Sequence, residues 1–319
     1  MTRWIWRAVV ILIAIGVPFI FTNEYYLSVI ILACIWALLA VSLNLIVGYT
    51  GQISIAHGAF FGIGAYAAAL LMLRFGLSFW LALPLSGIVA AVFGILVGYP
   101  ALRLKGAYFA IASMCFGLAI NVIITHWIDL TRGTMGLPGI PVPNPIGPLT
   151  FESMISKYYL IVVFLFITIF ITRRIVDSRI GKSFIAIGQN EVLAESIGVN
   201  LMRYKVMAFA VGAFFAGIGG SLYAIFFGFI SPEVSGMDIS FNTLVFVIIG
   251  GAGTMAGPIF GAFFLTVLPE TLQVLKEARM VIFGIILILT IIFLPKGLFP
   301  GMIPLWSKIV ARFKERKAP

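Results

Sequence analysis

Apolar segments about as long as a membrane is thick recur along this chain and constrain its fold more than any other feature. A helix needs about 20 mainly apolar residues to cross the hydrocarbon core of a bilayer. The segments that qualify, within a few residues, are 4–21, 27–47, 55–73, 79–99, 107–127, 158–171, 204–227 and 280–294. Because lipid offers no partner for an open sheet edge, we predict an all-α, polytopic transmembrane helix bundle that forms one domain over residues 1–319.

Composition and charge agree with a lipid environment. Apolar residues make up 62% of the chain and charged residues only 10%, whereas a soluble domain is about 25% charged. Lys and Arg outnumber Asp and Glu by 21 to 11, but they gather in short loops and at the two ends, which is the positive-inside pattern of a membrane protein. We therefore expect membrane lipid around the chain and no nucleic acid as a partner.

The basic residues also predict an orientation. Arg3 and Arg7 favour a cytoplasmic start. Counting spans from there places a loop at about 128–157 in the periplasm and a basic loop at about 173–205 in the cytoplasm. The basic C-terminal tail belongs on the cytoplasmic side as well. We expect a multi-pass protein of the bacterial inner membrane with both termini in the cytoplasm.

One apolar segment, residues 241–268, is broken by Gly250 to Gly253 and by Pro258. The C-terminal tail reaches the cytoplasm only if this segment returns to the side it left, as a re-entrant hairpin or as two short helices. Irregular backbone at membrane depth is tolerated only where protein or a water-filled cavity covers it. The break therefore predicts a functional feature.

A short internal repeat accompanies the break. Gly58-Ala-Phe-Phe-Gly62 follows a first break at residues 48–52, and Gly257-Pro-Ile-Phe-Gly261 follows the second break. Paired apolar segments interrupted by Gly or Pro point to a transport pathway, although chance similarity among Gly-rich strings is an alternative. Gly every four residues also clears a helix face for close packing, so plain packing and a hinge or pore-lining role both remain open.

Uncharged polar residues lie within or beside the broken segments. The residues that we expect at the translocation pathway or its hinges are Asn44, Gly48, Gly51, Gln52, Ser54, His57, Gly58, Gly250, Gly251, Gly253, Gly257 and Pro258. His57 fits either a neutral histidine bonded between helices or a group that lines the passage. Acidic residues, among them Glu233 and Asp238, are expected in loops or at boundaries, so the intramembrane charges of a proton- or sodium-driven carrier are missing.

The basic loop contains an amphipathic helical pattern. Apolar residues recur at helical spacing through Ile180, Phe184, Ile187, Ala194 and Ile197. Asp177 or Ser178 suits the start of the helix and Gly198 its end. The apolar face needs a partner surface, and the neighbouring Gln and Glu side chains favour another protein over the membrane surface.

Enzymatic motifs are not found. Gly181-Lys182-Ser183 resembles the end of a phosphate-binding loop, but Val176 stands where that loop needs its first Gly. With His57 and His126 as the two histidines, the sequence offers no metal cluster and no nucleophile–His–acid triad. We expect a non-enzymatic chain that binds no metal or cofactor, so that any ATP hydrolysis occurs in other subunits.

Four blocks resemble one known family. Residues 44–66, 103–110, 131–141 and 250–258 are similar to the signature strings of branched-chain amino-acid (LIV-type) ABC importer permeases, and the likeness to the M-type subunit is greater than to the H-type. The resemblance covers about residues 30–297. It implies four partners: an H-type permease, two cytoplasmic ATPase subunits that bind ATP and Mg, and a periplasmic substrate-binding protein.

The resemblance also implies that residues 191–198 are the ATPase-coupling segment. Its Ala residues are out of register with the family motif, so the docking position is open by about one turn. The candidate coupling residues are Arg179, Gly181, Glu191, Ala194, Glu195 and Gly198. We expect the permease subunit of an ABC importer for branched-chain or other hydrophobic amino acids. The alternatives are a permease for urea, short amides or aromatic acids, a stand-alone carrier or channel, and a non-transporting scaffold.

Overall fold

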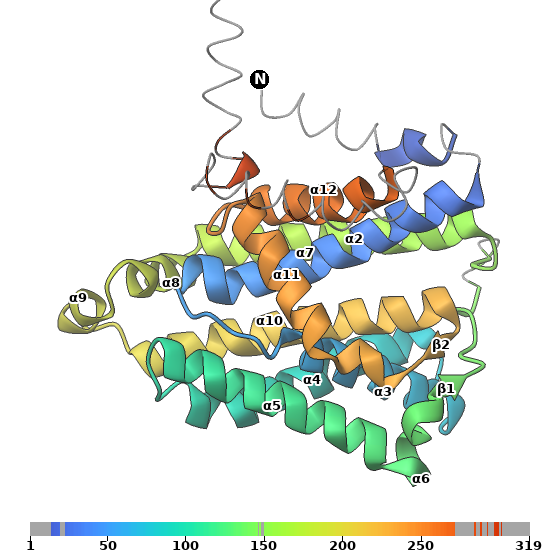
Figure 1. The fold of residues 1–319 in the computed structure, drawn as a ribbon, viewed down its shortest axis with the longest axis horizontal. Coiled ribbons are helices and arrows are strands. Elements are labelled where there is room, and N and C mark those ends of the chain that lie inside the picture. Colours follow the sequence, from blue (N-terminus) through green and yellow to red (C-terminus); the bar gives the residue numbers. More distant parts are fainter. Residues whose placement is uncertain are drawn as a thin grey trace, which may run out of the picture.

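Figure 1 shows an elongated bundle of helices in the computed structural model, which describes residues 14–19, 23–145, 147, 150–271, 284, 288, 292, 297–299 and 301. The elements of the first half are α2 (Glu24–Asn44), η1 (Leu45–Tyr49), α3 (His57–Leu73), α4 (Phe79–Ala101), α5 (Ala107–His126), α6 (Ile128–Thr131), η2 (Gly133–Met135) and β1 (Leu137–Pro138). Those of the second half are α7 (Met154–Asp177), α8 (Arg179–Gln189), α9 (Glu191–Ser196), α10 (Leu201–Phe227), β2 (Phe229–Ile230), η3 (Pro232–Ser235), α11 (Met237–Gly250) and α12 (Gly257–Thr271).

The predicted helical bundle is confirmed. Within the described residues, five helices are long and apolar enough to cross a membrane: α2 with η1, α4, α5, α7 and α10. Shorter apolar helices are α3, α11 and α12. Most of the predicted spans 4–21 and 280–294 lie outside the described residues, as do both chain termini.

Local sequence signals set the helix ends. Asn23 caps α2 by accepting a hydrogen bond from the Tyr25 amide at 2.9 Å, and Asn200 caps α10 by accepting one from the Arg203 amide at 3.0 Å. These caps satisfy amide groups that have no partner inside the helix. At the other end of α10, Gly228 takes the left-handed backbone conformation (φ 67°) that commonly stops a helix.

Among the five long helices, α2 and α10 are the most buried. In the 18-residue apolar stretch of each helix, the buried share is 83% for α2 with η1 and 78% for α10, against 39% for α4, 28% for α5 and 33% for α7. Glycines bring α10 into backbone contact with its neighbours. A Cβ on Gly220 would lie 2.0 Å from the Phe61 carbonyl oxygen, and one on Gly64 would lie 2.2 Å from the Gly217 Cα. The small residues of α10 therefore serve helix packing.

The two ends of the bundle differ. Figure 1 places α8 and α9 at the end where α5 begins, and α6, β1 and β2 at the opposite end. At the α6 end, β1 pairs with β2 in antiparallel fashion, with Leu137 opposite Ile230. This pairing fixes the loop that follows α6, and we call the segment 131–145 the outer strap.

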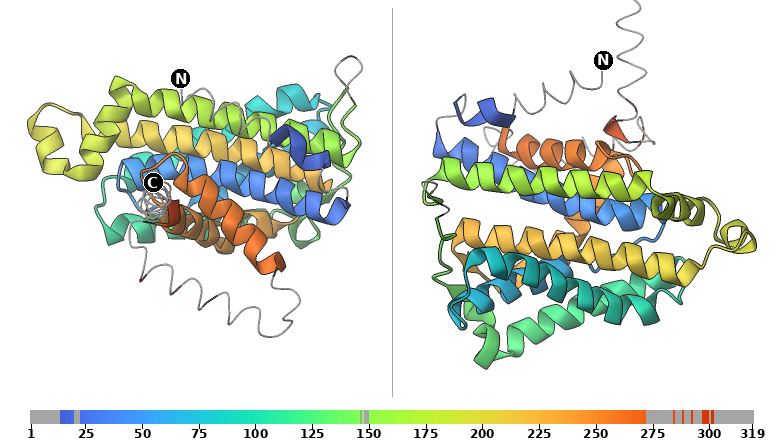
Figure 2. Two further views of the ribbon diagram at one scale, coloured as in Figure 1. Left: turned by 90° about the horizontal axis from the view of Figure 1, so that it is seen from above. Right: turned by 180° about the vertical axis from the view of Figure 1, so that it is seen from behind.

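The broken segment forms two short helices, as predicted. Gly250 and Gly261 let α11 and α12 touch, because a Cβ on Gly261 would lie 2.1 Å from the Phe246 carbonyl oxygen. The last turn of α12 lies beside the start of α2, where the Tyr25 hydroxyl contacts Glu270. The end of α10 lies near the start of α7, at the same end of the bundle (Figures 1 and 2). The chain therefore leaves one end of the bundle after α10 and returns to that same end with the last turn of α12.

Candidate functional site: two helix breaks and the α8–α9 segment

The first break follows α2 directly. The helix widens into the π-helical turn η1, after which residues 50–56 run without helical structure before α3 begins at His57. The Gln52 amide donates to the Ile46 carbonyl at 3.2 Å, and the Thr50 hydroxyl donates to the same carbonyl at 2.7 Å. Gly51 has φ 71°, a backbone conformation that residues with a Cβ atom rarely adopt. These groups hold the break in one defined shape.

The second break separates α11 from α12 at residues 251–256. Gly251 (φ 119°) and Gly253 (φ 75°) provide backbone conformations that L-residues rarely adopt. The Thr254 hydroxyl donates to the Gly251 carbonyl at 2.8 Å and accepts from the Gly257 amide at 3.1 Å, which caps α12. Pro258 falls in the first turn of α12, where the missing N–H leaves no helical bond unmade.

The two breaks meet inside the bundle. The Asn44 side-chain oxygen accepts a hydrogen bond from the Gly253 amide at 2.9 Å, and its amide nitrogen donates to the Thr254 carbonyl at 2.8 Å. Gly48 lies against the same turn, since a Cβ there would stand 2.3 Å from the Gly253 nitrogen. Asn44 is fully buried. We call this pair of bonds the Asn44 clamp.

His57 lies between α2 and α3. Its Nε2 is 2.7 Å from the Ser42 hydroxyl, which donates its own proton to the Leu39 carbonyl at 2.7 Å. The bond joins α2 to α3, and which of the two groups donates depends on the tautomer of His57. Its Nδ1 is buried and has no hydrogen-bond partner among the described residues. Next to it, the Gly58 amide donates to the Ser240 hydroxyl at 2.8 Å and so joins α3 to α11.

The predicted pathway residues lie in one connected region. Ser54 is buried in the first break, and the adjacent Ile55 amide donates to Ser113 of α5 at 3.0 Å. The faces cleared by Gly58 and Gly257 are filled: a Cβ on Gly58 would lie 2.6 Å from the Gly236 carbonyl oxygen, and one on Gly257 would lie 2.5 Å from the Gly251 carbonyl oxygen. Among the described residues these glycines thus pack against backbone.

Two acidic residues lie in the connection between β2 and the first turn of α11. The segment from β2 to α11 turns into the bundle, where Ser235 packs on Gly62 of α3. Gly62 precedes the last residue of α3 by eleven positions, roughly 16 Å along the helix. Glu233 and Asp238 flank this contact and are exposed in the isolated chain. Both acids thus belong to the connection between β2 and the first turn of α11, as the prediction of loop or boundary positions requires, and this connection turns back toward α3.

The α8–α9 segment is amphipathic, as its spacing predicts, but only part of the stripe is buried. The Ser178 hydroxyl, rather than Asp177, caps α8 by accepting from the Ile180 amide at 3.2 Å. The buried members of the predicted stripe are Phe184, Ile187 and Ala194, whereas Ile180 and Ile197 are exposed. Within α9, Val192 and Leu193 are exposed too. An apolar tip formed by Val192, Leu193 and Ile197 is therefore left uncovered by this chain.

The segment rests on the first break through backbone contact. A Cβ on Gly188 of α8 would lie 2.4 Å from the Tyr49 carbonyl oxygen, and one on Gly51 would lie 3.4 Å from the Gly188 Cα. At the start of α9, Glu191 Oε1 accepts from Gln52 Nε2 at 2.8 Å and from Lys205 Nζ at 2.6 Å. Glu191 thus points toward the bundle, and α9 is tied to the first break and to α10.

The remaining candidates of the coupling segment are distributed around this contact. Gly181 packs on the end of α7, where a Cβ would lie 2.2 Å from the Val176 carbonyl oxygen. Arg179 and Glu195 are exposed, and Gly198 ends the segment with φ 85°. Sequence reasoning placed Gln52 in the pathway and Lys205 among the loop charges, and it missed that both contact Glu191. The only available signal was their polarity beside apolar spans.

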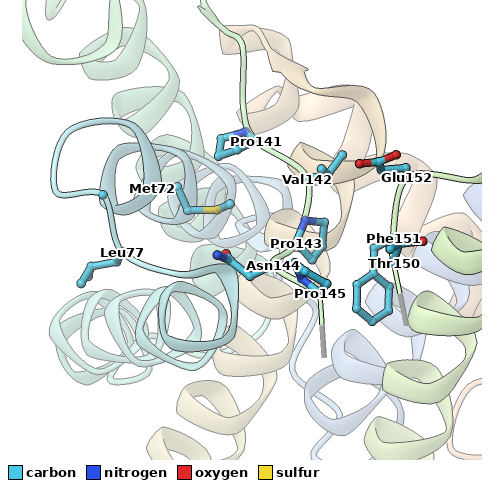
Figure 3. A pocket seen from close by; sticks show the side chains of 11 residues that line it. Met72, Leu77, Pro141, Val142, Pro143, Asn144, Pro145, Thr150, Phe151 and Glu152 are labelled. Atoms are coloured by element: carbon cyan, nitrogen blue, oxygen red, sulfur yellow. The ribbon is translucent and has the colours of Figure 1, made fainter. Parts of the chain in front are cut away.

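A pocket of about 340 Å³ lies at the opposite end of the bundle. Figure 3 shows the loop from Pro141 to Pro145 between Met72 on one side and Phe151 and Glu152 on the other. Trp80 fixes this loop by donating from its indole nitrogen to the Asn144 carbonyl at 3.0 Å. The pocket belongs to the outer strap and lies apart from the two breaks.

The arrangement defines a class of protein. Apolar spanning helices, two broken helices that meet inside the bundle and an amphipathic segment joined to one of the breaks are typical of a membrane transport permease. Among the described residues, no group of three or more His, Cys, Asp or Glu could hold a metal ion.

Comparison with known proteins identifies the family. The chain belongs to the family described as branched-chain amino acid transport system / permease component, whose model matches residues 25–291. The resemblance stated from the sequence is thereby confirmed.

Individual relatives agree. The high-affinity branched-chain amino acid transport system permease protein LivM of Salmonella typhimurium is 31% identical over 313 aligned residues, which cover 91% of this chain and 73% of the relative. LivM of Escherichia coli gives the same values. The permease protein LivH of Salmonella typhimurium is 24% identical, over 88% of this chain and 96% of the relative. No solved structure gives a significant match.

Proposed function

We propose that this chain is the M-type permease subunit of an ATP-driven importer for branched-chain or other hydrophobic amino acids in the bacterial inner membrane. The observation that carries the proposal is the contact of the α8–α9 segment with the first helix break through Gly188 and Glu191. An amphipathic segment joined to a broken helix is a means by which an external motor moves a transmembrane bundle. The names of the relatives, which are permease proteins of branched-chain amino acid systems, support this reading.

One of the two ATPase subunits docks on α9 in this proposal. Val192, Leu193 and Ile197 form an exposed apolar tip, and an apolar cluster rimmed by polar groups is typical of a protein-binding site. Glu195 and Arg179 are exposed nearby and supply polar contacts at the rim. ATP and Mg bind to those subunits, and the permease itself catalyses no reaction. This placement puts α8, α9 and both chain termini in the cytoplasm.

The second permease covers the face that includes α11. Glu233, Asp238 and Asn242 are exposed there in the isolated chain, and polar groups at membrane depth face protein or water rather than lipid. The translocation pathway runs between the two permeases along this face. A proton- or sodium-driven carrier is disfavoured, since the buried polar side chains of the described region are Asn, Gln, Ser, Thr and His, apart from Lys205, which is paired with Glu191 of the α8–α9 segment.

The periplasmic binding protein delivers substrate at the opposite end, on the outer strap. The strap is held by β1–β2 pairing and by a hydrogen bond of the Ile140 amide to the Gly228 carbonyl at 3.1 Å. A fixed loop loses less conformational freedom on binding than a disordered one. The strap is therefore suited to a docking role.

The test is transport by the reconstituted complex. This chain, its partner permease, two ATPases and the binding protein are placed in proteoliposomes, and uptake of labelled leucine is measured with and without ATP. Leucine accumulation that requires ATP and the binding protein supports the proposal. Uptake of urea or an aromatic acid in place of leucine would keep the importer and replace the substrate. Uptake without the ATPases would establish a stand-alone carrier instead.

A further inference from the structure

A carboxylate in the α8–α9 segment connects three separate parts of the fold. Oε1 of Glu191, the first residue of α9, accepts hydrogen bonds from Gln52 of the first break at 2.8 Å and from Lys205 of α10 at 2.6 Å. In the sequence, Gln52 precedes Glu191 by 139 positions and Lys205 follows it by 14. One oxygen atom thus joins the α8–α9 segment, the first break and α10.

The ion pair of Glu191 with Lys205 is much less exposed than an ordinary surface ion pair. The side chain of Lys205 is only 4% exposed and that of Glu191 is 24% exposed. The other ion pair among the described residues, Arg173 with Asp177, is 50% and 71% exposed. Exposed pairs contribute little to stability, whereas breaking a buried pair leaves an uncompensated charge. Separating Glu191 from Lys205 is therefore costly unless another partner replaces it.

The carboxylate is not fully satisfied. Glu191 Oε2 is buried and has no hydrogen-bond partner among the described residues. A pair kept only for stability gains most when all its polar atoms are bonded. The second oxygen can accept a further hydrogen bond, so Glu191 has the capacity to take a different donor. The geometry thus suits a contact that differs between two states of the bundle.

The first break can pass such a change inward. Gly188 of α8 contacts the Tyr49 carbonyl without space for a methyl group, so α8 and η1 move together. At the inner side of η1, Asn44 holds the second break through Gly253 and Thr254. A displacement of α9 therefore reaches both breaks through hydrogen bonds of 2.8 and 2.9 Å and through the backbone contact of Gly188 with Tyr49.

We infer that Glu191, Gln52 and Lys205 form a latch that couples movement of the ATPase-docking segment to the two helix breaks, with Glu191 as a positioning residue for transport. The inference rests on the proposed function, because it requires ATPases that act on α9. It assigns the role of Glu191 to contacts inside this chain, while the exposed tip of α9 contacts the ATPase.

The test compares ATP hydrolysis with substrate uptake in the full reconstituted complex. Glu191→Gln removes the charge and keeps the size of the side chain. Gln52→Leu keeps the ion pair and cuts only the link to the first break. Asp177→Asn, which removes the carboxylate of the exposed pair at the same end of the bundle, is the matched control. The quantity measured is the number of ATP molecules hydrolysed per leucine transported, together with assembly of the complex by co-purification.

The expected result is an assembled complex in which Glu191→Gln and Gln52→Leu each raise this ratio by about tenfold, within the usual range of coupling between sites, while Asp177→Asn leaves it unchanged. The exchange variant Glu191→Lys with Lys205→Glu should recover part of the coupling that Glu191→Lys alone loses. A wild-type ratio in Gln52→Leu, which leaves the ion pair intact, would overturn the latch whatever Glu191→Gln does to assembly. Failure of the wild-type complex to import with ATP would instead overturn the proposed function.

Discussion

Asn44 and Gly253 lie 209 positions apart in the sequence and are joined by a hydrogen bond of 2.9 Å from the Gly253 amide to the Asn44 side-chain oxygen. The same side chain donates to the Thr254 carbonyl at 2.8 Å. A side chain of one helix break thus satisfies both a donor and an acceptor of the other break. The two broken halves of the chain are coupled through this one buried amide.

Replacing Asn44 tests whether the clamp stabilises the fold. Asn44→Leu leaves the Gly253 amide and the Thr254 carbonyl without a partner in a buried site, which costs about 1–3 kcal/mol for each unsatisfied group. We expect a lower unfolding temperature for the purified protein in detergent. Asn242→Leu, which removes an exposed amide from α11, should change it far less. Equal unfolding temperatures for Asn44→Leu and the wild type would contradict the clamp.

Gly48→Ala tests how closely the two breaks approach. The added methyl group would stand 1.9 Å from the Asn44 side-chain oxygen and 2.3 Å from the Gly253 nitrogen, so the breaks must separate at a cost of about 1–3 kcal/mol. Gly117→Ala is the matched control, because its methyl group would meet nothing nearer than 3.5 Å. We expect thermal destabilisation and slower uptake for the first variant only. A neutral Gly48→Ala would show that the breaks lie further apart.

Leu193→Asp tests the docking surface of α9. Leu193 is 64% exposed in the isolated chain, and burying a carboxylate against an apolar pocket of a partner is strongly unfavourable. We expect the ATPase subunits to co-purify at least about tenfold less well, while membrane insertion is unchanged. Ile128→Asp on α6, at the opposite end and 70% exposed, should retain them. Normal co-purification of Leu193→Asp would leave the membrane surface as the partner of α9.

Asp238→Asn tests the polar edge of α11. The residue is exposed in a re-entrant segment, where an acid is expected to face water or a partner. We expect initial uptake rates to fall severalfold with little change in thermal stability, because the side chain is not buried in this chain. Asp129→Asn, exposed on α6 outside the two breaks, should transport normally. If both variants transport equally well, the pathway does not pass Asp238.

The sequence predicts the breaks better than their surroundings. The Gly250-Gly251-Ala-Gly253 run cannot sustain a helix, and Pro258 suits the first turn of α12, so the second break follows from local chemistry. The π-helical turn η1 has no such signal, because Leu45-Ile46-Val47 is an ordinary apolar run. The contact of Asn44 with Gly253 arises only from tertiary packing. Local patterns therefore locate the irregular segments, and the fold decides which of them meet.

The charged residues illustrate the same limit. Lys205 belongs to the basic loop that predicts the orientation, yet it is buried and paired with Glu191. Gly198 (φ 85°) lies in the turn between α9 and α10, the two helices that carry Glu191 and Lys205. Glu233 and Asp238 were expected at a membrane boundary because acids are costly in lipid. The inward turn of the chain after β2 brings the segment that carries both acids against α3, and no periodicity in the sequence reports that turn.

The pairing of β1 with β2 has a consequence for communication across the membrane. The two-residue strand β2 leads through η3 into α11, which ends at the second break, while α8 contacts the first break at the opposite end of the bundle. The outer strap and the α8–α9 segment therefore each connect to the junction at Asn44, one through β2, η3 and α11 and the other through η1. In the proposed importer, a loaded binding protein on the strap and an ATPase on α9 would act on one shared joint from its two sides.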